Sequence, residues 1–141
     1  MKQSSYEDFK YMLQDTGNLY IGARFTYREL MEHPDMNFKF KSIMEHYIFK
    51  EADPDTSLES EFYYLKEESF VYRTFEQLKT KVKINILVDK KSLFGKKKRV
   101  YVEKIMPMKN FVSIPLAQKK RDGVVVQEIV LSKLALMSFV V

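Results

Sequence analysis

The spacing of the apolar residues changes near Leu78, and this change limits the folds that the chain can adopt. Upstream, apolar residues recur every three or four positions, which is the period of a helix with one buried face. The clearest such run is Phe40, Ile43, Met44, Tyr47 and Ile48. Downstream, Val82, Ile84 and Ile86 alternate with polar residues, as in a half-buried strand. We therefore predict an α+β fold, with N-terminal helices packed on one face of a C-terminal, mainly antiparallel sheet.

The length of the chain is that of one ordinary domain. One hydrophobic core typically serves roughly 100 to 200 residues, and this chain has 141 residues, 45% of them hydrophobic. We expect a single domain over residues 1–141, with a helical part over about 1–78 and a strand-rich part over about 79–141. The absence of cysteine excludes disulfides, thiolate zinc sites, iron–sulfur clusters and cysteine nucleophiles.

The first predicted helix begins near the N-terminus. Ser4 and Ser5 are typical capping residues, and Gly17 is a typical residue at a helix end. Between them, helical spacing places four apolar residues on one face, namely Tyr6, Phe9, Met12 and Leu13.

Two further helices are expected before residue 54. Thr26 and Glu29 form a capping box, and the helix that they begin is short because Pro34 disfavours a helical conformation in the residue before it. Asp35 or Asn37 can cap the next helix, which carries the apolar run from Phe40 to Ile48.

The segment from 57 to 79 is open to two interpretations. Thr56 with Glu59, and later Ser69, can cap two more helices. The same segment is rich in aromatic and β-branched residues, which also suit strands. Helices are favoured, and strands remain the alternative.

The strand-rich part is predicted to begin with a hairpin. Strand-like alternation starts at Lys81, a turn-prone stretch follows from Asp89 to Lys98, and β-branched and aromatic residues recur from Arg99 to Ile105. Two antiparallel strands joined by a Lys-rich turn explain this pattern.

The residues after the hairpin have weaker signals. Pro107 and Pro115 bracket a short piece around 111–114, and Lys119 to Gly123 is expected to be a charged turn. Val124 to Leu131 is a further strand candidate. Residues 132–141 suit either a strand or a helix.

Charge is distributed unevenly along the chain. The net charge is −6 over residues 1–78, +8 over 79–99 and +3 over 100–141. Such a local positive field attracts polyanions. The candidate anion-binding residues are Lys79, Lys81, Lys83, Lys90, Lys91, Lys96, Lys97, Lys98 and Arg99.

We interpret this basic hairpin as the best candidate for a functional surface, with nucleic acid or an acidic protein surface as its partner. Phe94 and Tyr101 could stack on a base, although aromatic residues next to β-branched residues more often pack within the sheet. The alternative is a solvated strand face whose lysines keep the hairpin from pairing with other chains. Because the block is almost all Lys, we expect contact with phosphates and little reading of bases.

Catalytic and metal-binding patterns are weak. His33 and His46 lie in similar Met-Glu-His tripeptides, but their spacing matches no metal motif, so neither a metal nor a cofactor is expected. Carboxylates are plentiful, including Asp53 and Glu67, but no GxSxG, Walker or dinucleotide pattern is present. A non-catalytic binding module is favoured over an enzyme.

Two alternatives for function stay open at this point. One is an enzyme or small-ligand binder with a pocket between helices and sheet. The other is a homo-oligomer in which the acidic first part of one copy docks on the basic hairpin of another.

The expected location follows from the two ends of the sequence. The N-terminus lacks the apolar core of a signal peptide, and Glu128 and Lys133 interrupt the apolar C-terminal stretch. We therefore expect a cytoplasmic protein with no membrane partner.

Overall fold

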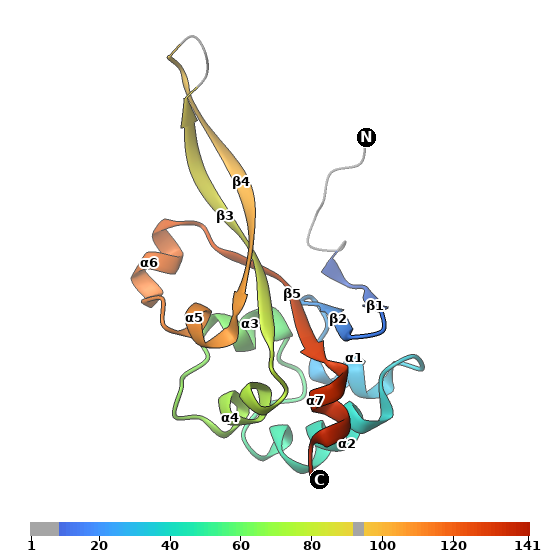
Figure 1. Ribbon diagram of the computed structural model, residues 1–141. Helices are drawn as coiled ribbons and strands as arrows, with labels where there is room; N and C mark the ends of the chain where they lie inside the picture. Colours follow the sequence, from blue (N-terminus) through green and yellow to red (C-terminus); the bar gives the residue numbers. More distant parts are fainter. Residues whose placement is uncertain (1–8, 92–94) are drawn as a thin grey trace.

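The computed structural model describes residues 9–91 and 95–141 and contains a five-stranded antiparallel sheet with helices packed against it (Figure 1). The strand order is β1-β2-β5-β3-β4. This confirms the predicted α+β fold. The strands are β1 (Met12–Gln14), β2 (Asn18–Gly22), β3 (Lys81–Lys91), β4 (Lys97–Pro107) and β5 (Val125–Ser132). The helices are α1 (Tyr27–Glu32), α2 (Phe38–His46), α3 (Leu58–Tyr63), α4 (Phe70–Gln77), α5 (Met108–Val112), α6 (Leu116–Arg121) and α7 (Lys133–Ser138).

Helices α1 and α2 begin where their capping residues predict. The Thr26 side chain accepts a hydrogen bond from the backbone N–H of Glu29, and the Glu29 side chain accepts one from the Thr26 N–H, which completes the capping box. Asn37 caps α2 by accepting from the Phe40 N–H. These caps satisfy backbone donors that the first helical turn leaves without partners.

The segment between 57 and 79 is helical, as favoured over the strand alternative. The hydroxyl of Ser57, rather than that of Thr56, caps α3 by accepting from the Ser60 N–H. Ser69 caps α4 in the same way, and Val71 and Phe75 point into the core.

The core lies between the helices and one face of the sheet. From the sheet, Val82, Ile84 and Ile129 have no exposed surface, as the alternation of β3 predicts. Phe40 from α2 and Phe75 from α4 are also buried, and the centroids of their rings lie 6.1 Å apart. These contacts fill the space between the helices and the sheet with hydrocarbon.

The predicted hairpin is present and longer than its sequence signal. β3 and β4 pair over their full lengths, from Lys81 opposite Pro107 to Lys91 opposite Lys97. On its other side, β3 pairs with β5 only from Lys81 to Asn85. The final segment, open between strand and helix in the sequence, forms helix α7, with Ser132 as its N-cap.

The predicted first helix is wrong for its described residues. Its capping residues lie outside the described part of the chain, and Met12 and Leu13 belong to strand β1. β1 pairs with β2, and the N–H of Gly22 donates to the carbonyl of Tyr11 over 2.8 Å. The sheet therefore takes strands from both ends of the chain.

The interpretation of residues 107 to 121 also needs correction. The piece bracketed by the two prolines is helix α5, and most of the expected charged turn is helix α6. Pro107 and Pro115 stand at the N-cap positions of these helices. A proline at a helix start removes no helical hydrogen bond, so these residues begin helices instead of interrupting them.

Candidate functional site

The β3–β4 hairpin extends beyond the rest of the sheet, at the opposite end of the molecule from α7 (Figure 1). The last backbone contact from the body to β3 in the described residues is the Leu87 N–H donating to the carbonyl of Asp122 over 2.9 Å. We call residues 88–91 and 95–100, which lie past this contact, the distal ribbon. It is a two-stranded structure, and such ribbons gain little stability by themselves.

The distal ribbon and its turn carry the net charge of the protein. The chain has 24 basic and 19 acidic residues. Six of the basic residues and one of the acidic residues lie between 89 and 99, which leaves 18 of each sign in the other 130 residues. The net charge of +5 is therefore concentrated at one end of the molecule.

The basic side chains emerge on both faces of the distal ribbon. Cross-strand partners share a face and successive residues alternate. Lys90 and its partner Lys98 therefore lie on one face, and Lys91, Lys97 and Arg99 lie on the other. All five are exposed, and Lys96, just before β4, is exposed as well.

The strand register places lysine directly opposite lysine twice in succession. Lys90 faces Lys98 and Lys91 faces Lys97. Like charges in directly opposed positions destabilise a β-ladder, because the two side chains leave the backbone about 5 Å apart. Arg99, by contrast, pairs with Asp89 across the strands, with 3.5 Å between Nε and Oδ1. A bound polyanion would relieve the two lysine pairs.

Lys79, Lys81 and Lys83 lie at the opposite end of β3 from the distal ribbon. Lys79 lies in the turn between α4 and β3, and Lys81 begins the strand. Lys83 is half-buried and forms an ion pair with Glu103, with 3.1 Å between Nζ and Oε1. At about 3.3 Å per residue, Lys81 is about 33 Å from Lys91 along the strand. The nine candidate residues therefore form two separate groups.

Of the two aromatic residues predicted to be able to stack on a base, the structure describes Tyr101. Tyr101 is 60% exposed on β4, opposite Leu87, so its ring is accessible beside the distal ribbon. Phe94 lies outside the described residues. Tyr101 remains a candidate for stacking.

If the lysines served to protect an edge strand, they would lie along the exposed part of that strand. β4 is the edge of the sheet over its whole length. Its middle exposes apolar residues, with Tyr101 at 60% and Ile105 at 61%. Edge protection calls for charge along such a stretch; Lys104 lies within it, whereas the other three β4 cations, at residues 97–99, lie beyond it toward the tip. This placement favours a binding role at the tip.

The two histidines make local contacts. His33 Nδ1 accepts from the Asp35 N–H over 3.0 Å, and the ring lies edge-on to Phe25. The His46 ring nitrogen Nδ1 lies 2.8 Å from the carbonyl of Ser42. Within residues 9–91 and 95–141, no group of three or more His, Asp or Glu side chains is placed to hold a metal ion.

Carboxylates and tyrosines meet at two small depressions beside Tyr64. One has a volume of about 240 Å³ and includes Glu59, and the other has about 230 Å³ and includes Glu61. Burial raises the pKa of both carboxyl groups, and Glu51 raises that of Glu61 further. Ligand pockets typically measure about 300 to 1,000 Å³, so these depressions are small for a substrate.

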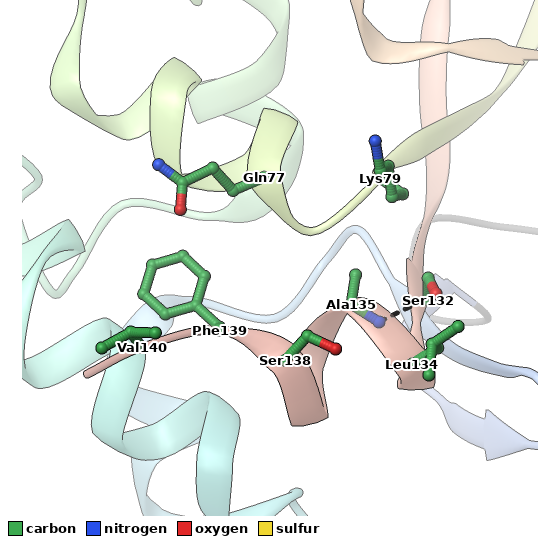
Figure 2. A pocket seen from close by; sticks show the side chains of 8 residues that line it. All are labelled: Gln77, Lys79, Ser132, Leu134, Ala135, Ser138, Phe139 and Val140. Carbon is green, nitrogen blue, oxygen red and sulfur yellow. Dashed lines mark hydrogen bonds between the residues drawn. The ribbon is translucent and has the colours of Figure 1, made fainter.

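A larger groove, of about 530 Å³, lies at the edge of the molecule between the α4–β3 turn and α7 (Figure 2). Gln77 and Lys79 line one side, and Ala135 and other α7 residues, with Phe139 and Val140 just after the helix, line the other. Its lining contains no carboxylate, imidazole or phenol. Among its lining residues, Lys79 is the one ionisable side chain.

One buried cation, Lys119, was not predicted from the sequence. It is 3% exposed in α6, its Nζ donates to the carbonyl of Tyr63 over 3.2 Å, and it lies 4.4 Å from the centre of the Phe111 ring. Burial lowers the pKa of this ammonium. The contacts join α3, α5 and α6, which is a structural role. The apolar spacing of Phe111 and Ile114 was the signal that this region is packed.

Comparison with known proteins adds no identification. No protein-family model matches the sequence, and the search of curated proteins gives no match. Among the described residues, the helices are all too short or too polar to cross a bilayer.

Proposed function

We propose that this protein is a non-catalytic module that binds nucleic acid through the distal ribbon. The observation that carries the proposal is the ribbon itself: it projects past the sheet, bears basic residues on both faces and opposes lysine to lysine at two successive positions. A structure that accumulates net positive charge away from its core is suited to a polyanion.

The residue types indicate how binding would work. The distal ribbon and its turn contain five lysines and one arginine, and the arginine already contacts Asp89. Lysine ammonium groups act as point charges on phosphates, whereas bidentate reading of base edges relies mainly on arginine and amide side chains. We therefore expect binding with little sequence preference and a steep dependence on salt.

The small-ligand and enzyme alternatives have weaker support. Core side chains fill most of the space between the helices and the sheet, where that hypothesis placed a pocket, and the depression between α3 and β5 has a volume of only about 240 Å³.

The homo-oligomer alternative rests on charge complementarity between the acidic first part and the ribbon. It predicts a molecular mass that falls as salt increases, which light scattering can measure.

The test is a fluorescence-anisotropy titration of labelled oligonucleotides from about 50 to 200 mM salt, over which phosphate-driven binding weakens strongly. Each phosphate neutralised on duplex DNA contributes about −0.9 to the slope of log affinity against log salt, so six cations allow a slope of about −5. Replacing Lys96, Lys97 and Lys98 together by Gln should reduce the magnitude of this slope by about 2.7. Absence of binding at the low-salt end would rule out the proposal.

A further inference from the structure

We infer that the preferred ligand of the distal ribbon is duplex DNA of the B form, with the ribbon lying in the major groove. This inference rests on the proposed nucleic-acid function and adds the class of nucleic acid and the groove. Four features of the ribbon carry it: its width, its reach, the distribution of its cations and its aromatic content.

Width and reach both match the major groove. This groove is about 12 Å wide and 8.5 Å deep and admits a two-stranded β-ribbon. Past Leu87, β3 continues for the four residues from 88 to 91, which at 3.3 Å per residue is a projection of about 13 Å before the turn. The ribbon can therefore reach the floor of the groove before the body meets the phosphate backbone.

The distribution of cations suits a groove with two phosphate walls. Lys90 and Lys98 point from one face of the ribbon, and Lys91 and Lys97 point from the other. In the groove, each pair faces one of the two sugar–phosphate strands. A protein that tracks a single strand needs its charges along one side only, so two basic faces favour a duplex.

The aromatic content and the groove dimensions separate the competing ligands. Single-stranded nucleic acid binds on successive aromatic side chains, and residues 81–107 contain two aromatic residues, Phe94 and Tyr101, which are seven positions apart in the sequence. Double-stranded RNA has a deep and narrow major groove that protein elements do not enter. Duplex DNA is the form that matches all four features.

The experiment compares one sequence of about 20 nucleotides as duplex DNA, duplex RNA and single-stranded DNA, each titrated with the full chain at the same salt. We expect affinity for duplex DNA to exceed the other two by about tenfold or more. Equal or tighter binding to duplex RNA would overturn the inference while leaving the proposed function intact. Tighter binding to the single strand, lost in a Tyr101→Ala variant, would overturn it in favour of stacking.

Dimethyl sulfate gives a second readout, because it methylates guanine N7 in the major groove and adenine N3 in the minor groove. Saturating protein should protect guanine N7 by several-fold and leave adenine N3 reactive. The triple substitution of Lys96, Lys97 and Lys98 by Gln should restore N7 reactivity at the same protein concentration. Protection of adenine N3 alone would overturn the groove assignment. If none of the three nucleic acids binds, the proposed function fails together with the inference.

Discussion

Strand β3 passes through two environments, and the contrast between them separates stability from binding. Its proximal half pairs with both β4 and β5 and buries Val82 and Ile84 completely. Its distal half pairs with β4 alone and exposes Asp89, Lys90 and Lys91. The body thus holds the apolar contacts that stabilise the fold, and the distal ribbon holds the net charge. Substitutions in the body should change stability, and substitutions in the ribbon should change binding.

The largest effect on stability is expected from Ile43→Ala. Ile43 lies on α2 with no exposed surface, so its truncation should lower the free energy of unfolding by about 2 to 5 kcal/mol. The matched control is Ile105→Ala on β4, where the side chain is 61% exposed and the cost should stay below about 1 kcal/mol. Urea unfolding of both variants measures the difference. Equal costs would contradict the contrast between body and edge.

A smaller loss is expected from Gly22→Ala. A Cβ atom at Gly22 would lie within van der Waals overlap of the backbone of Phe9 and Tyr11, which crosses directly over this glycine. Forcing an extra carbon into such a packed site typically costs about 1 to 3 kcal/mol. Hydrogen exchange should show that the backbone amides of β1 lose protection first. Unchanged stability would mean that β1 is not held as described.

The pH dependence of the body should reflect Glu61. Because burial raises its pKa in the folded protein, the folded state binds the proton more tightly than the unfolded state, whose Glu pKa is about 4.3. The contribution of this group to stability therefore falls as pH rises from about 4.3 through the folded pKa. Glu61→Gln should be more stabilising, relative to the wild type, at pH 7 than at pH 5. A difference that is constant with pH would contradict the raised pKa.

The smallest effect is a gain of stability from Lys79→Gly. Lys79 has a φ of 55° at the end of α4, a left-handed conformation that costs a side-chain-bearing residue roughly 1 kcal/mol and glycine little. The gain should be up to about 1 kcal/mol in urea unfolding. Nucleic-acid affinity should not change, since Lys79 lies at the end of β3 far from the distal ribbon. A loss of stability would show that the charge matters more than the backbone conformation.

Local sequence signals predicted elements that depend on their own residues. The capping box at Thr26, the cap at Asn37 and the alternation from Lys81 identified α1, α2 and β3 correctly. The first helix failed because pairing with β2 outweighed a short helical pattern, and Gly22 allows the backbone of Phe9 to approach. The alternation of Leu19 and Ile21 was the available signal for β2.

The candidate site was predicted as one block, and the structure divides it. Nothing in the sequence shows that pairing between β3 and β5 stops at Asn85, because that boundary depends on the position of a strand 40 residues away in the chain. The same boundary decides which lysines project and which remain at the body. Among the nine candidate residues, the six between 90 and 99 satisfy both conditions for the proposed site, clustering and projection.

The central claim is that charge at the distal ribbon, and not basic charge in general, binds nucleic acid. Two triple Lys→Gln variants of equal charge test it directly: Lys96, Lys97 and Lys98 at the tip, and Lys79, Lys81 and Lys109 around a depression at the base of the hairpin. Salt titrations with duplex DNA should show a slope reduced in magnitude by about 2.7 for the tip variant and a slope near that of the wild type for the base variant. Equal losses in the two variants would contradict the account.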